Sequence, residues 1–130
     1  MSYVPDDLTV DAVRGLPFHR TQIYHLKWDK QDAFWAALER RAELDREGGI
    51  DNLVLTVWNA GIGTETPVVM IRVSAESLEA DQAGLAERMR IREAYWDEWV
   101  EQNEIMNAAA VSIERHDQTR ISELSSTRPR

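Results

Sequence analysis

The chain has 130 residues, a net charge of −8 and 43% hydrophobic residues, which suits one globular domain. This acidic balance argues against binding to nucleic acid or to an acidic membrane surface, because Lys and Arg supply most of the affinity for phosphates. The absence of cysteine excludes disulfides, thiolate nucleophiles and cysteine-ligated zinc. The start, MSYVPDDLTV, does not resemble a signal peptide, and no apolar run approaches the roughly 20 residues that span a bilayer, so we expect a cytoplasmic protein.

The first 18 residues are predicted to form an arm that lies on the domain or on a partner. In them, DDLTVDAVRGLP can form one short helical turn that Thr9 caps and that Gly15 and Pro17 stop. The segment RTQIYHLKW, residues 20–28, predicts a strand because it is rich in β-branched and aromatic residues. Alternation along a strand places one set of side chains on each face, Gln22, Tyr24, Leu26 and Trp28 against Thr21, Ile23, His25 and Lys27.

A helix is predicted over residues 30–47, with Asp29 as its N-cap and Gly48-Gly49 as its stop. Two strands follow, NLVLTVWN and VVMIRVS, joined by the turn AGIGTETP into a hairpin. The turn contains Gly61-x-Gly63, but a dinucleotide-binding fingerprint needs a third glycine and a following helix. We therefore interpret these glycines as turn residues.

A long helix is predicted from about Ser77 to Ala110, broken or bent near Gly84, and VSIERHD then predicts a fourth strand. The domain therefore covers residues 19–117, and residues 118–130 are expected to form a polar tail. The order β-α-β-β-α-β predicts an α+β, ferredoxin-like fold with a four-stranded antiparallel sheet. Two helices cover one sheet face, and we expect the other face, carrying Ile23 and several Val or Ile, to pair with a second sheet in a homodimer.

The segment YWDEWVEQNEIM raises the question of an acidic catalytic or metal centre. On a helical wheel, Trp96 and Trp99 share the buried stripe, while the acids Glu93, Asp97, Glu101 and Glu104 border it. A di-metal site in a helix would need a Glu-x-x-His pair, and residues 77–110 contain no histidine. We therefore expect a covering helix with a solvated acidic edge, and no metal.

Arg92, Asn103 and Asn107 fall on the same stripe as Trp96, where buried polar groups need partners. In one interpretation, Arg92 extends to solvent and the two asparagines cap the sheet edge or bind water. In the other, helix and sheet enclose a pocket for a small apolar ligand with one polar or anionic end. The residues expected to line it are Tyr24, Trp28, Arg92, Trp96, Trp99 and Asn103.

His25 is the candidate for acid–base catalysis, because the unperturbed pKa of histidine lies near neutrality. The alternative is a hydrogen bond within the dimer interface.

The order of elements, the segment QIYHLKWDKQDAFWAAL and the hairpin TVWNAGIGTETPVVMIRVS resemble the dimeric α/β-barrel superfamily, nearest its NIPSNAP-like and small monooxygenase-like branches. The resemblance covers about residues 19–117 and implies a barrel formed by two paired sheets. Haem-degrading and haem-binding members need a helical histidine, which this chain lacks in its second helix.

Two functions follow from this sequence. The first is a small-molecule-binding dimer, in its finer form a cofactor-free oxygenase or isomerase that acts on a small aromatic or apolar substrate. The alternative is a non-catalytic structural or interaction protein of the same fold, in which every aromatic side chain serves the core.

Overall fold

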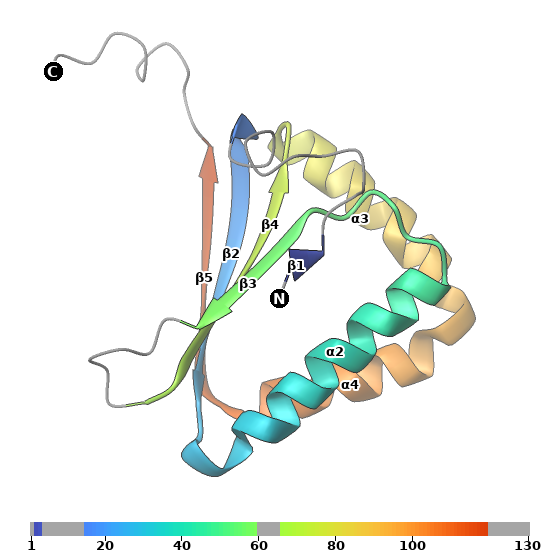
Figure 1. The fold of residues 1–130 in the computed structure, drawn as a ribbon. Helices are drawn as coiled ribbons and strands as arrows, with labels where there is room; N and C mark the ends of the chain where they lie inside the picture. Colours follow the sequence, from blue (N-terminus) through green and yellow to red (C-terminus); the bar gives the residue numbers. More distant parts are fainter. Residues whose placement is uncertain (1, 4–14, 60–65, 120–130) are drawn as a thin grey trace, which may run out of the picture.

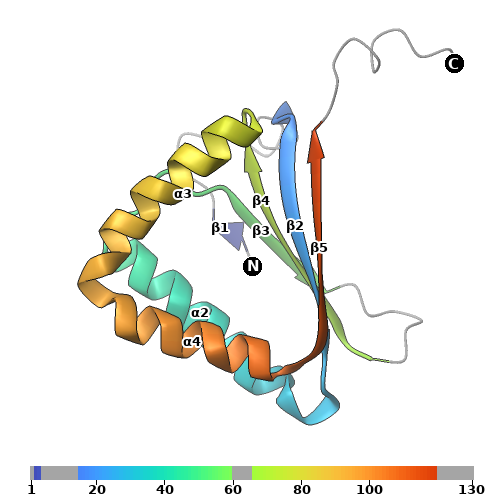
Figure 2. The ribbon, with the colours of Figure 1, turned by 180° about the vertical axis from the view of Figure 1, so that it is seen from behind.

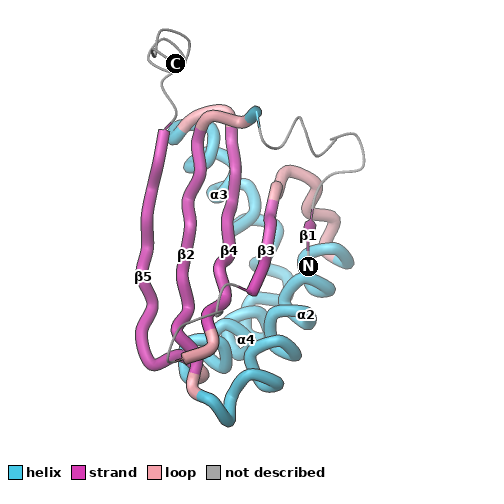
Figure 3. The backbone as a smooth tube through the Cα atoms, turned by 60° about the vertical axis from the view of Figure 1, so that its left-hand side comes forward, coloured by secondary structure: helices cyan, strands magenta, loops and turns pink. Residues whose placement is uncertain are grey.

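The computed structural model describes residues 2–3, 15–59 and 66–119 of the chain. Its elements, in chain order, are β1 (Ser2–Tyr3), β2 (Phe18–Leu26), the 3-10 turn η1 (Trp28–Lys30), α2 (Gln31–Glu47), β3 (Leu55–Asn59), β4 (Val68–Ala75), α3 (Leu78–Arg92), the 3-10 turn η2 (Glu93–Tyr95), α4 (Trp96–Ala108) and β5 (Ala110–Thr119). The strands form one antiparallel sheet in the order β1-β3-β4-β2-β5 (Figure 1). Helices α2, α3 and α4 lie on one face of this sheet (Figure 3). The predicted β-α-β-β-α-β topology with an antiparallel sheet is confirmed for β2 to β5.

The N-terminal segment contributes a short strand that the sequence did not predict. Ser2 lies opposite Thr56 and Tyr3 opposite Leu55, so that β1 extends the sheet beyond β3. Residues 6–14 of the predicted helical turn capped by Thr9 lie outside the described residues, as do residues 120–130 of the predicted tail.

Helix α2 ends where its two glycines predicted, but it begins differently. Gly49 has a φ of +86°, and the amides of Gly49 and Ile50 donate to the carbonyls of Arg46 and Asp45 at 3.1 and 3.0 Å. This pair of hydrogen bonds is the Schellman arrangement, which needs a left-handed residue that glycine adopts without strain. The prediction of Asp29 as the N-cap is wrong, because residues 28–30 form the turn η1 and α2 starts after it.

The second helix is interrupted at Glu93–Tyr95, not at Gly84 as predicted. Figure 2 shows α3 leading away from the end of β4 and α4 returning to the start of β5. Gly84 lies inside α3, and a Cβ there would come within 3.1 Å of Nη1 of Arg88. The missing side chain therefore makes room for a guanidinium and does not break the helix.

The helix-facing side of the sheet carries most of the branched apolar residues. Val57, Val69 and Ile71 are buried beneath the helices, in a core that also contains Tyr24, Leu26, Phe34, Leu38 and Met106. The prediction that the free face carries several Val or Ile of the central hairpin is therefore largely wrong. By strand alternation and register, the free face carries the buried Val68 and the half-buried side chains of Ile23, Met70 and Trp58, among mainly polar residues.

Candidate ligand-binding site

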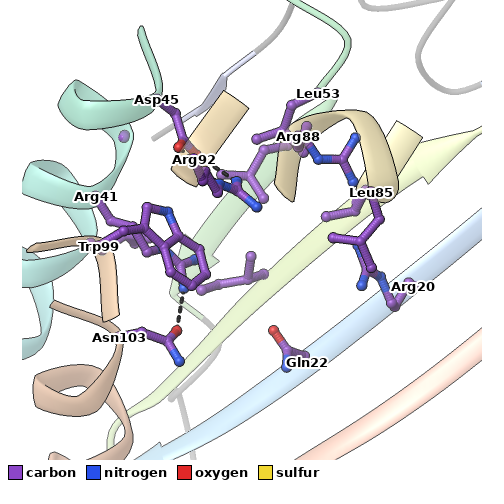
Figure 4. A pocket seen from close by; sticks show the side chains of 15 residues that line it. Arg20, Gln22, Arg41, Asp45, Leu53, Leu85, Arg88, Arg92, Trp99 and Asn103 are labelled. Atoms are coloured by element: carbon purple, nitrogen blue, oxygen red, sulfur yellow. Dashed lines mark hydrogen bonds and ion pairs between the residues drawn. The ribbon is translucent and has the colours of Figure 1, made fainter. Parts of the chain in front are cut away.

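A cavity of about 240 Å³ lies between the helices and the sheet (Figure 4). It is lined by Arg20, Gln22, Leu38, Arg41, Ala42, Asp45, Leu53, Leu55, Ile71, Val73, Leu85, Arg88, Arg92, Trp99 and Asn103. Its volume is just below the range of about 300–1,000 Å³ that is usual for ligand pockets. A small molecule therefore fits its size.

A buried salt bridge in the cavity wall connects α2 to α3. Nε and Nη2 of Arg92 donate to the two carboxylate oxygens of Asp45 at 2.9 and 2.6 Å, and both side chains are buried. The hydroxyl of Tyr95 also donates to Asp45, at 2.9 Å. The Tyr95 ring lies so close to Gly48 that a Cβ at that position would be 2.5 Å from a ring carbon. The bend at Tyr95 and the end of α2 are thus fitted to each other.

Trp99 forms an aromatic wall between two arginines. The guanidinium carbons of Arg92 and Arg41 lie 4.5 and 5.1 Å from the centre of its ring, a distance at which cation–π attraction operates. Trp96 stacks on Trp99 with ring centres 5.6 Å apart. Nη1 of Arg41 donates to Oδ1 of Asn103 at 2.6 Å, and burial lowers the pKa of Arg41. These contacts hold Arg41, Trp99 and Asn103 in fixed positions.

Arg88 and Arg20 form the second cationic group of the cavity. Nη2 of Arg20 lies 3.4 Å from Oδ1 of the buried Asp81, whereas Nη2 of Arg88 lies 3.9 Å from the same oxygen. Nη1 of Arg88 makes only long contacts with Asn52, at 3.4 and 3.5 Å. Burial first, and the charge of Arg92 second, lower the pKa of Arg88 to about 10.

Several buried donors near the cavity have no hydrogen-bond partner among the described residues. They are Nε of Arg20, Nε and Nη2 of Arg88, and Nε1 of Trp99. Buried polar atoms are nearly always paired, because an unmade hydrogen bond costs free energy. Each of these donors belongs to a residue that lines the cavity, so the unpartnered buried donors are grouped around it.

The structure brings together Arg92, Trp99 and Asn103, half of the residues expected to line a pocket. Tyr24 is instead buried against Phe34, with ring centres 5.0 Å apart, and burial raises its pKa. Trp28 lies in η1 with 68% of its surface exposed, and Trp96 lies behind Trp99 with 37% exposed. The expected placement of these three residues in the cavity wall is wrong.

His25 lies on the opposite sheet face from the cavity. Successive side chains of a strand point to opposite faces, so His25 faces away from Gln22, which lines the cavity, and from Tyr24. Its Nε2 lies 2.6 Å from Oε2 of Glu114 on β5. This hydrogen bond lowers the pKa of the Glu114 carboxyl. Among the residues that the structure describes, no group of three or more histidines and carboxylates is placed to hold a metal ion, and no helix is long and apolar enough to cross a membrane.

Comparisons with known proteins identify the fold. A NIPSNAP family protein of unknown function from Agrobacterium tumefaciens is 18% identical, with a TM-score of 0.57 over 84% of this chain and 94% of its own. A dimeric ferredoxin-like protein from an uncultured marine organism is 11% identical, with a TM-score of 0.56 over 87% and 95%. A proposed antibiotic biosynthesis monooxygenase from Chloroflexus aurantiacus is 12% identical, with a TM-score of 0.50 over 80% and 92%.

No family model matches the chain, and no curated protein sequence matches it. Identities as low as those of the solved structures show a common fold and nothing finer. At that level, the ferredoxin-like fold predicted from the sequence is confirmed.

Proposed function

We propose that this protein binds a small molecule in the cavity between its helices and its sheet, and that it does so as a homodimer. The single observation that supports binding is the cavity itself, in which the apolar side chains of Leu38, Ile71 and Leu85 face convergent polar groups. Ligand sites usually combine apolar walls with a few fixed polar groups. If the protein were instead a structural protein with all its aromatic residues in the core, this space should be filled by side chains.

The finer form of the proposal is a cofactor-free oxygenase or isomerase acting on a small aromatic or apolar substrate. The cavity lining contains no histidine among the described residues, and its carboxylate Asp45 is held by Arg92 and Tyr95. Acid–base catalysis by His25 would therefore take place on the free sheet face, inside a dimer. Under that proposal, His25→Gln abolishes turnover and leaves binding in the cavity unchanged.

Binding is tested by native mass spectrometry of the freshly purified chain, followed by a variant that fills the cavity. Ala42 lines the cavity from α2, and Ala36 is an exposed alanine on the same helix. We expect the wild-type protein and Ala36→Leu to carry a dissociable small molecule, and Ala42→Leu to lose it. Loss from neither variant, or from both, contradicts the proposed location.

The dimer is supported by the free face and by the comparison protein described as dimeric. Ile23 and Met70 lie opposite each other at the centre of this face, next to Trp58. We expect Ile23→Glu to give a monomer in analytical ultracentrifugation. Leu78→Glu is the control, because Leu78 is 42% exposed in the first turn of α3, where a carboxylate is compatible with the helix dipole. A dimer that survives Ile23→Glu places the contact elsewhere.

A further inference from the structure

The cavity contains an excess of positive charge that the protein does not compensate. Four arginines line it, Arg20, Arg41, Arg88 and Arg92, whereas the carboxylates that contact them inside are Asp45 and Asp81. Four positive and two negative charges leave a net charge of +2 at this site, in a chain whose total net charge is −8. Buried charges are costly unless they are paired, so an excess of this kind needs a counter-charge.

The excess charge lies at two places: Arg88 and Arg20 share the single carboxylate of Asp81, and Arg41 donates to the neutral amide of Asn103. The Arg88 side chain is 3% exposed, yet two of its three nitrogens lack a hydrogen-bond partner among the described residues. Nε of Arg20 is also unpartnered and buried. Figure 4 shows both arginines on the same side of the cavity as Leu85, and the Nη2 atoms of Arg20 and Arg88 lie 3.4 and 3.9 Å from one oxygen of Asp81. Arginine presents its N–H groups in a planar fork that matches the oxygens of a carboxylate or a phosphate.

The rest of the cavity suits an apolar body attached to such an anion. Leu38, Leu55 and Ile71 lie in its wall, together with the aromatic ring of Trp99. An inorganic anion alone would leave these apolar side chains in contact with empty space or water.

We propose that the ligand is a small organic oxyanion, a carboxylate or a phosphate on an apolar body, whose oxygens are bound by Arg88 and Arg20. This inference rests on the proposed binding function and names its ligand class. The anion supplies both the missing acceptors and the missing negative charge.

The test is isothermal titration calorimetry of the full chain with benzoate, phenyl phosphate and neutral benzyl alcohol. These probes share an aromatic body and differ in the oxyanion. We expect at least one of the two anions to bind roughly 10- to 100-fold more tightly than the alcohol, the effect of one or two charge-assisted hydrogen bonds. The order of the two anions distinguishes a carboxylate ligand from a phosphate ligand.

Two variants of α3 make the test specific. Arg88→Met removes the buried cation, and Arg90→Met removes an exposed one, 66% exposed and paired with Glu87. We expect Arg88→Met to abolish the preference for anions and to leave the affinity for benzyl alcohol within about twofold, whereas Arg90→Met behaves like the wild type. Because Arg88 is incompletely paired, Arg88→Met is also expected to keep or raise the melting temperature.

The outcomes separate this inference from the proposed function. If benzyl alcohol binds as tightly as both anions, the inference is overturned and binding in the cavity stands. If none of the three binds, both are overturned. If Arg88→Met lowers the melting temperature and retains the anion preference, Arg88 is a structural residue and the inference is overturned.

Discussion

The salt bridge between Asp45 and Arg92 gives the sharpest prediction on stability. Its two hydrogen bonds, of 2.9 and 2.6 Å, join side chains that are 4% and 7% exposed. We consider Asp45→Asn, Arg92→Met and the double variant. Asp45→Asn leaves Arg92 without its counter-charge and raises the net charge of the cavity from +2 to +3. It therefore also lowers the pKa of Arg88 further, because Asp45 is one of the charges that raise it.

The magnitude follows from the burial of both partners. Removal of one partner of a buried pair costs about 3–5 kcal/mol, because the other charge stays buried without compensation. Stabilities of whole domains are about 5–15 kcal/mol, so either single variant removes a large part of the total. The double variant has no stranded charge, so its cost should be smaller than the sum of the two single costs by about 2 kcal/mol or more.

The measurement is urea unfolding followed by tryptophan fluorescence, since Trp99 lies against Arg92. All variants are compared at one protein concentration, because the stability of a dimer depends on it. Asp51→Asn is the control, an exposed carboxylate whose loss should change the free energy of unfolding by about 0.5 kcal/mol or less. Additive costs in the Asp45 and Arg92 variants would refute the reasoning, because they would show that neither charge depends on the other.

Two further predictions concern other contacts. Gly48→Ala should lower the melting temperature, since its Cβ meets the Tyr95 ring at 2.5 Å, and Tyr95→Ala in the same chain should remove that sensitivity; equal effects in both backgrounds would disprove the contact. The hydrogen bond from His25 lowers the pKa of Glu114 from 4.5, so its stabilisation is present above that pH and is lost as the pH falls through the lowered pKa. The melting temperature of Glu114→Gln should therefore depend less on pH in this acidic range than that of the wild type, and identical profiles would contradict the assignment.

The order of elements could be predicted because it depends on local signals. Gly48-Gly49 ends α2 through its own backbone geometry, and strand composition marks β2, β3, β4 and β5. The break at Glu93–Tyr95 could not be predicted in this way, because it accompanies a tertiary contact between Tyr95 and Asp45, which lie 50 residues apart. The helical wheel assumed one unbroken helix through this point, and it therefore predicted that Trp96 is buried.

The candidate site was predictable only in part for a related reason. The three correctly placed residues, Arg92, Trp99 and Asn103, come from one stretch whose polar residues interrupt an apolar stripe. Arg20 and Arg41 come from β2 and α2, and a periodicity argument treats arginines in such elements as ordinary surface residues. Arg88 did carry a signal: it precedes Arg92 by four residues, one helical turn, and so shares its face.

Helix α3 differs from α2 in what attaches it to the protein. The buried residues of α3 are Asp81, Arg88 and Arg92, all charged, whereas α2 buries Phe34, Ala37, Leu38 and Leu44 along with Asp45. Few apolar contacts mean a low free energy of local opening, so the backbone amides of α3 should exchange with deuterium sooner than those of α2. An oxyanion held between Arg88 and Arg20 would tie α3 to β2 and slow that exchange. The amides of α3 would then report whether the cavity is occupied.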